Sequence, residues 1–202
     1  MTTTPDHEAA GRRSHAKGEA RRRQILESAI ELFAERGVDA ASLRTIGEAI
    51  GVSHTALRHY FASRDDLLIE VYRAHEASTS ESLADVDGDP VLAMAETAER
   101  NRSIPGLVQL YTTLTTDALQ EQHPQTQDFV RGRFRALRSS IAAKIAAAQE
   151  AGELAADFPP EDVAALIIAA SDGLQVQWLL DPEAIDVGRI LSLLGRLMPE
   201  RP

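Results

Sequence analysis

Apolar residues recur at steps of three and four along most of the chain, which is the period of an amphipathic helix. The first such stripe predicts a helix over about 19–36 and comprises Ile25, Leu26, Ala29, Leu32 and Phe33. No stretch alternates apolar and polar positions as a half-buried strand does. The pattern therefore predicts an all-α fold.

Two short helices are predicted next, over 42–50 and 53–60. Ser42 and Ser53 are each placed to cap a helix, because a side-chain oxygen at this position accepts a hydrogen bond from a free backbone N–H. Gly51 stands where a helix commonly ends in a left-handed residue. Two short amphipathic helices joined by a tight turn with Gly have the helix-turn-helix layout, whose second helix commonly enters the DNA major groove.

The remaining stripes and Pro positions predict further helices over about 63–82, 90–102, 105–121, 124–151, 160–180 and 182–198. The polar segment 1–17 lacks an apolar stripe, and we expect a disordered arm there. Its basic residues could contact phosphates or the minor groove, or could serve only as a solubilising tail. The predicted organisation is a disordered arm over 1–17, a helix-turn-helix domain over 18–62 and a larger helical domain over 63–202.

Residues of about 20–72 closely resemble the TetR family of transcriptional regulators. The resemblance is carried mainly by Phe33-Ala34-Glu35-Arg36-Gly37, Ser42-Leu43-Arg44, Gly51-Val52-Ser53, Tyr60-Phe61 and Leu67-Leu68. In the C-terminal half, Asp172-Gly173-Leu174 and Trp178-Leu179-Leu180-Asp181-Pro182 resemble a BetI-like subgroup. One departure is Arg58, where the family usually has Tyr. The resemblance implies a homodimeric DNA-binding regulator of transcription, usually a repressor, that a small molecule releases from its operator.

The charge distribution fits this interpretation better than the net charge of −10 does. Residues 1–64 carry 10 Lys or Arg and 8 Asp or Glu, whereas residues 65–202 carry 11 and 23. The acidic excess therefore lies in the half that would face away from DNA.

Candidate DNA contacts lie on and beside the second short helix. We expect base contacts from residues on that helix, although each could instead touch phosphate or solvent: His54, Thr55, Arg58 and His59. Hydroxyl and guanidinium groups near helix starts suit phosphate oxygens. The phosphate candidates are Ser42, Tyr60 and Arg64, Ser53 is a further candidate DNA contact, and Arg44 could contact either base or phosphate.

The resemblance also implies an effector pocket within the helices of the C-terminal half. Its candidate residues share an apolar helix face or offer a polar tip: Tyr72, His75, Leu107, Tyr111, Leu114, Thr115 and Trp178. Such a stripe can also be plain core. The four Arg residues at 131, 133, 135 and 138 are interpreted as a solvated or salt-bridged face. The effector is expected to be small and largely apolar.

The apolar stripes of the last two predicted helices could pack within one chain or pair with a second copy as a four-helix bundle. The resemblance favours dimerisation, with candidate interface residues Leu166, Ala170, Leu174, Ile190 and Leu194. A two-fold dimer predicts a near-palindromic operator.

Other classes of protein find less support in the sequence. No nucleophile elbow, phosphate loop or His spacing typical of a metal site is present, so we expect neither an enzyme nor a cofactor or metal. The longest strongly apolar run, Val163 to Ala170, is too short to span a membrane. The absence of cysteine and of a signal-peptide core fits a cytoplasmic protein. The alternative that remains is a helical adaptor without a DNA-binding role.

Overall fold

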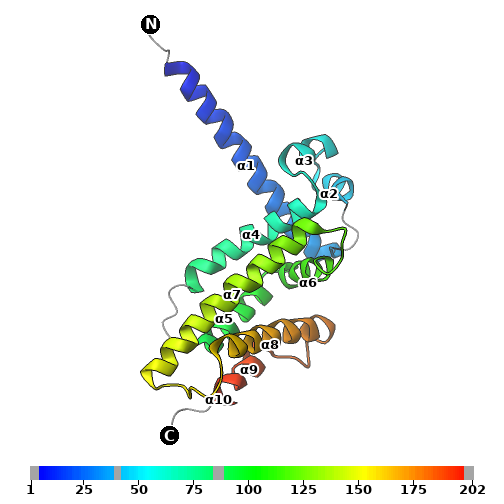
Figure 1. Ribbon diagram of the computed structural model, residues 1–202. Helices are drawn as coiled ribbons and strands as arrows, with labels where there is room; N and C mark the ends of the chain where they lie inside the picture. The colour runs from blue at the N-terminus through cyan, green and yellow to red at the C-terminus, as the bar shows by residue number, and fades with distance from the viewer. Residues whose placement is uncertain (1–4, 39–41, 84–88, 198–202) are drawn as a thin grey trace.

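The computed structural model describes residues 5–38, 42–83 and 89–197, and within these residues all regular structure is helical (Figure 1). The prediction of an all-α fold is confirmed. The helices are α1 (Pro5–Arg36), α2 (Leu43–Ile50), α3 (His54–Tyr60), α4 (Arg64–Leu83), α5 (Pro90–Ser103), α6 (Leu107–Asp117), α7 (Pro124–Ala151), α8 (Pro160–Leu180), α9 (Val187–Leu191) and α10 (Leu193–Leu197).

The helix-turn-helix forms through the local signals that predicted it. Ser42 caps α2 by accepting a hydrogen bond from the N–H of Thr45, and Ser53 caps α3 by accepting one from the N–H of Ala56. Gly51 ends α2 with a φ of 70°, a left-handed conformation that Gly adopts without steric cost. Ile46 and Leu57 are fully buried and fix the two helices on α1.

The packing continues from this unit into the rest of the chain without a break. One cluster of buried apolar side chains joins α1, α2 and α3 to α4, α6 and the start of α7. Phe33, Leu67 and Leu114 are among its fully buried members. Because this core is closely packed, a displacement of α4 or α6 also shifts the helices of the helix-turn-helix.

α4 is also tied to α1 by polar contacts. Glu70 of α4 pairs with Arg22 of α1 and with Arg73 one turn later on its own helix. Burial pushes the pKa of Glu70 upward, but the hydrogen bonds from these two guanidinium groups outweigh it and hold that pKa below its usual range. Arg22 in addition lies over the ring of Phe61, 5.3 Å from its centroid.

The second half of the chain packs around α7 and α8. A separate buried cluster joins α5, α7 and α8, with Ile145 and Ile167 at its centre and Leu194 of α10 against its edge. In Figure 1, α9 and α10 lie at the end of the molecule away from α2 and α3.

The predicted boundaries were wrong at the start of the first helix and at the helix over 105–121. The segment 1–17 was expected to be disordered, but α1 begins at Pro5, while residues 1–4 lie outside the described part of the chain. Residues 8–17 include three Ala, two Arg, one Glu and one Lys, residue types that favour a helix even without an apolar face. The helix predicted over 105–121 is shorter and ends at Asp117.

The last predicted helix, 182–198, is broken. Residues 181–186 form a turn and a loop, and α9 and α10 are separated at Ser192. The Ser192 hydroxyl donates to the carbonyl of Arg189 at 2.8 Å, a local bond that competes with regular helix geometry. Met198 lies outside the described residues.

α8 is more apolar than the sequence interpretation allowed. Within the described residues, α8 is the one helix long and apolar enough to cross a membrane by length and composition. In the structure, 28% of its most apolar window is buried. The uninterrupted apolar run of α8, Val163 to Ala170, is shorter than its apolar stretch as a whole because Ser171 and Asp172 interrupt it. Asp172 in the middle of α8 and the extensive packing of α8 on α7 make it part of this helical fold.

Candidate DNA-binding surface and ligand cavity

α3 presents an open polar surface. The side chains predicted to contact bases are all exposed: His54, Thr55, Arg58 and His59. Tyr60 is half-buried and packs its ring edge-on against His59, with centroids 5.3 Å apart. The exposed donors and acceptors of α3 are therefore available to an external partner.

The start of α2 adds further polar groups beside this surface. Ser42 is exposed, and its hydroxyl lies 2.8 Å from the hydroxyl of Thr45. Arg44 pairs with Glu48 one turn later at 2.9 Å, with 79% of its side chain exposed. An ion pair as exposed as this contributes little stability, so Arg44 can exchange Glu48 for a phosphate.

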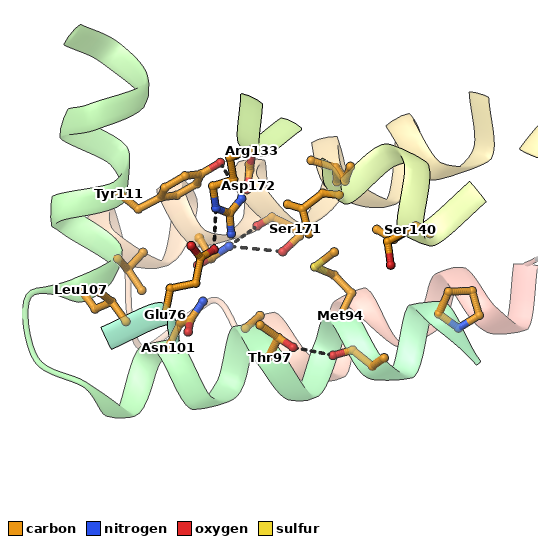
Figure 2. Close-up of a pocket in the computed structure, with 18 of the residues that line it drawn as sticks. Glu76, Met94, Thr97, Asn101, Leu107, Tyr111, Arg133, Ser140, Ser171 and Asp172 are labelled. Carbon is orange, nitrogen blue, oxygen red and sulfur yellow. Dashed lines mark hydrogen bonds and ion pairs between the residues drawn. The ribbon is translucent and has the colours of Figure 1, made fainter. Parts of the chain in front are cut away.

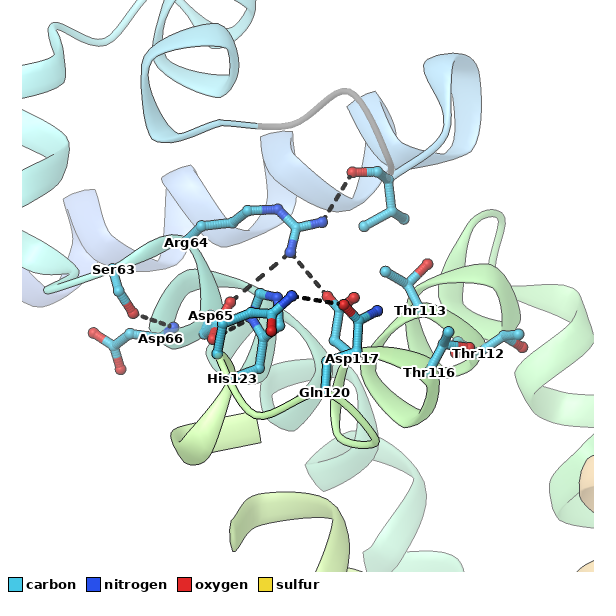
Figure 3. A network of polar contacts seen from close by, with 12 residues as sticks. Ser63, Arg64, Asp65, Asp66, Thr112, Thr113, Thr116, Asp117, Gln120 and His123 are labelled. Atoms are coloured by element: carbon cyan, nitrogen blue, oxygen red, sulfur yellow. Dashed lines mark hydrogen bonds and ion pairs between the residues drawn. The ribbon is translucent and has the colours of Figure 1, made fainter. Parts of the chain in front are cut away.

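Arg64 does not lie on this open surface (Figure 3). Its Nη1 contacts Asp117 at 3.0 Å and Asp65 at 3.8 Å, and its Nη2 lies 3.4 Å from the carbonyl of Val38. Only 25% of its side chain is exposed. The guanidinium therefore joins the segment after α1 and the start of α4 to the end of α6, an arrangement that does not favour the predicted phosphate contact.

Arg64 belongs to a polar cluster of three helices. Asp65, Asp117 and His123 bring their ligand-type atoms within 4.8 Å of one another, and His123 Nδ1 lies 2.8 Å from Asp65. Helical spacing does not reveal this group, because its members are far apart in sequence. The Arg64 guanidinium already supplies the positive charge between the two carboxylates.

A cavity of about 140 Å³ lies between α4, α5, α6, α7 and α8 (Figure 2). Of the residues predicted to bind a ligand, the structure places three in its wall: Tyr72, Leu107 and Tyr111. None of the other wall positions was predicted to bind a ligand. They include Glu76, Met94, Arg133, Leu137, Ile141, Lys144, Ile168, Ser171, Asp172 and Gln175.

Four predicted ligand residues lie outside the wall of this cavity. Leu114 is fully buried in the cluster that joins α6 to α1. The Thr115 hydroxyl donates to carbonyls of its own helix, at Tyr111 and Thr112. Trp178 lies under the guanidinium of Arg102, 5.1 Å from its ring centroid. His75 is half-buried outside the cavity wall, where burial lowers its pKa.

A charged network forms one end of the cavity. Arg133 Nε donates to Glu76 at 2.8 Å, and its Nη1 donates to the hydroxyl of Tyr111 at 3.3 Å. The guanidinium also lies 4.6 Å from the Tyr111 ring centroid and 5.5 Å from that of Tyr72, and the two rings stack on each other at 5.3 Å. Arg133 was predicted to lie on a solvated or salt-bridged face; it is salt-bridged, and it lies in the cavity wall.

Asp172 completes this network from α8. It accepts one hydrogen bond, from the Tyr111 hydroxyl at 3.3 Å, and forms no ion pair within 4 Å among the described residues. Burial raises the pKa of Asp172, although Arg133 and the Tyr111 hydroxyl act in the opposite direction. The sequence signal for this site is that Asp172 is the one carboxylate of α8 beyond its first turn, within an otherwise apolar stretch.

A second feature of α8 is its exposed apolar side. Leu166 is 68% exposed, Val176 is 41% exposed and Leu180 is 82% exposed. The other predicted interface residues are only partly buried: Ala170, Leu174, Ile190 and Leu194. An apolar surface of this kind on one helix is typical of a site that contacts another protein.

Comparisons with known proteins identify the class. The family described as "Bacterial regulatory proteins, tetR family" matches residues 25–71, and the one described as "BetI-type transcriptional repressor, C-terminal" matches residues 111–199. Together they cover about two thirds of the chain. The chain belongs to the TetR family of helix-turn-helix transcriptional regulators, and its C-terminal half is of the BetI type.

Full-length relatives agree with this assignment. The chain is 26% identical over 183 residues to the HTH-type transcriptional regulator PksA of Bacillus subtilis, covering 87% of each protein. A transcriptional regulator from Saccharomonospora viridis, solved with choline, has a TM-score of 0.70 at 23% identity, over 88% of this chain and 95% of that one. A SmeT–triclosan complex has a TM-score of 0.66 at 20% identity, over 84% and 85%. The matched curated proteins are transcriptional regulators rather than enzymes.

Proposed function

We propose that this protein is a ligand-responsive repressor that binds its operator through α2 and α3 and leaves it when a small molecule fills the cavity. It would act in the cytoplasm, where bacterial operators lie. The observation that carries this proposal is the dual role of α4. Its first turn holds Arg64, beside the helix-turn-helix, and two turns later the same helix supplies Tyr72 and Glu76 to the cavity.

α6 provides a second connection between the same two places. Leu107 and Tyr111 line the cavity, and Asp117 at the end of the helix pairs with Arg64. A ligand that shifts α6 or α4 therefore changes the contact that holds the helix-turn-helix. It can do so only if it binds the shifted state more tightly than the DNA-bound state.

The exposed apolar side of α8 supports a homodimer. Pairing two copies would remove Leu166, Val176 and Leu180 from water, and two recognition helices would then be held at a fixed separation. Such a dimer reads a near-palindromic operator whose half-sites lie about one DNA turn or somewhat more apart. A change in the separation of the two α3 helices then weakens binding without unfolding either unit.

The solved neighbours support a ligand role for the cavity region only by analogy. One of them was solved with choline and another with triclosan, so this fold accommodates chemically different small molecules. The wall of the present cavity is polar as well as apolar, so a largely apolar effector would also need a polar group.

The proposal is tested by footprinting on the DNA next to the protein's own gene, followed by ligand titrations with and without saturating operator. A specific, salt-sensitive footprint is expected, since phosphate contacts release counterions. An effector should bind about 5–150-fold more weakly when operator is present, and operator should bind more weakly by the same factor when effector is present. Equal ligand affinities in the two titrations would rule that molecule out as an inducer.

A further inference from the structure

The wall of the cavity offers more acceptors of hydrogen bonds than free donors around Asp172. The Asp172 carboxylate, which can accept several hydrogen bonds, receives one from Tyr111. Gln175 donates through Nε2 to the carbonyl and hydroxyl of Ser171, at 3.3 and 3.2 Å, and its Oε1 takes part in no hydrogen bond within the described residues. A ligand with N–H groups would satisfy these oxygens.

The charges at this end of the cavity lead to the same conclusion. Glu76 and Arg133 neutralise each other at 2.8 Å, which leaves the charge of Asp172 without an ion pair among the described residues. Lys144, the other basic residue in the wall, lies eleven positions beyond Arg133 on α7, or about 16 Å along the helix axis. A cation therefore finds net attraction beside Asp172, whereas an anion meets two carboxylates.

The aromatic rings further restrict the kind of cation that the cavity can bind. A quaternary ammonium ion has no N–H group and depends on open ring faces for its binding. The rings beside Asp172 are those of Tyr72 and Tyr111, and the Arg133 guanidinium already lies over both. A cation that donates hydrogen bonds has the advantage here.

We propose that the cavity binds a protonated primary or secondary amine, with its nitrogen at Asp172 and Gln175 and a short apolar group against Met94, Leu137, Ile141 and Ile168. This inference rests on the proposed function, in which the same cavity holds the effector. It assigns Asp172 as the residue that selects the ligand (Figure 2).

The experiment compares four probes that share one six-carbon chain: hexylamine, 1-hexanol, hexanoate and hexyltrimethylammonium. Binding to the full-length protein without DNA is measured by calorimetry at pH 7, where an aliphatic amine is protonated. Hexylamine should bind at least about tenfold more tightly than each of the other three, as expected for a charge-assisted hydrogen bond. Equal affinities for hexylamine and hexyltrimethylammonium would overturn the requirement for N–H groups. Equal or tighter binding of the alcohol or the carboxylate would overturn the whole assignment.

Two variants test the role of Asp172. Asp172→Asn should lose the preference for hexylamine, while Asp128→Asn, which changes a carboxylate that is 82% exposed on α7, should keep it. The melting temperature of Asp172→Asn should equal or exceed that of the wild type, because the change removes a buried charge, so lost binding is not lost folding. Retention of the amine preference by Asp172→Asn would refute the proposal.

A final arm separates this inference from the proposed function. Hexylamine is added to the complex of the wild-type protein with its operator. Release of the DNA supports both proposals. Tight, Asp172-dependent binding without release supports the ligand class and overturns only the effector role.

Discussion

Arg64 and Asp117 are joined by a 3.0 Å ion pair although 53 positions separate them in the chain. The pair links the first turn of α4 to the last turn of α6, and α4 and α6 also supply Tyr72 and Tyr111 to the cavity. The helix-turn-helix and the cavity are therefore connected through the same two helices. The pair is the most direct place to test this connection.

Arg64→Ala should lower stability and operator affinity without changing the salt dependence of binding. Removing the guanidinium leaves the Asp117 carboxylate, 16% exposed, without its closest cation and should cost about 1–3 kcal/mol. The measurements are thermal melting and gel shifts at several salt concentrations. A decrease of the salt slope by about one unit would instead mean that Arg64 touches a phosphate.

Asp117→Ala and the double variant complete this test. In a double-mutant cycle, the two single changes should couple, because they remove the same contact. If the stability losses of the two single variants add up to that of the double variant, the contact between the two side chains does not stabilise the fold.

Gly47→Ala should abolish operator binding. A Cβ at Gly47 would lie 2.5 Å from the carbonyl oxygen of Val52, a backbone atom that cannot move aside without opening the turn between α2 and α3. Gly132→Ala is the matched control, since it lies on α7 with nothing within 4 Å of the added Cβ. The control should bind operator normally and be slightly more stable, as expected for Gly to Ala within a helix. Normal footprinting by Gly47→Ala would show that the turn tolerates other geometries.

Thr55→Ala should relax sequence preference at one position in each half-site, because Thr55 is exposed at the start of α3, where side chains reach base edges. A lost base contact typically removes about 1–3 kcal/mol of discrimination. Selection from randomised duplexes measures the effect.

Arg44→Ala should differ by weakening binding to all sequences and flattening the salt slope by about one unit.

The sequence predicted the helix-turn-helix because every signal for it is local. Ser42, Gly51 and Ser53 act on backbone groups within three or four positions, and these signals were confirmed. The helical period likewise located α7 and α8 to within a residue. It could not show the break at Ser192, because apolar positions continue across it with an unchanged period.

The cavity was less predictable because its groups meet only in three dimensions. Arg133 was grouped with the three nearby Arg residues on a solvated or salt-bridged face, yet of these four it is the one that pairs with Glu76 in the cavity wall. Leu114 and Tyr111 lie on one stripe, and only their neighbours decide that one is core and the other lines the cavity. Periodicity predicts which face of a helix is buried, but it does not predict which residues of other helices that face contacts.

Leu166→Glu should convert a dimer into monomers. Leu166 is 68% exposed in the single chain, so the change should leave the monomer folded, while a carboxylate buried in an interface without a partner costs several kcal/mol. Light scattering across a range of concentrations measures the assembly. Leu119→Glu is the matched control, because Leu119 is 86% exposed and lies outside α8. If Leu166→Glu remains dimeric, the interface lies on another surface.

Asp172 should make the ligand-free protein less stable as the pH rises. Burial raises the pKa of Asp172 in the folded chain above its value in the unfolded chain, so between these two values the folded state binds more protons. Its contribution is therefore most favourable below the unfolded pKa and is lost as the pH rises through the folded pKa.

Asp172→Asn does not titrate at this position, so the difference in melting temperature between the variant and the wild type should grow in favour of the variant from pH 4 to pH 7. Each kcal/mol of this difference corresponds to about 2–4 °C for a chain of this size. A saturating amine should reverse the order at pH 7, because it stabilises only the wild type. A difference that shrinks with rising pH would show that Arg133 and Tyr111 stabilise the Asp172 carboxylate more than burial penalises it.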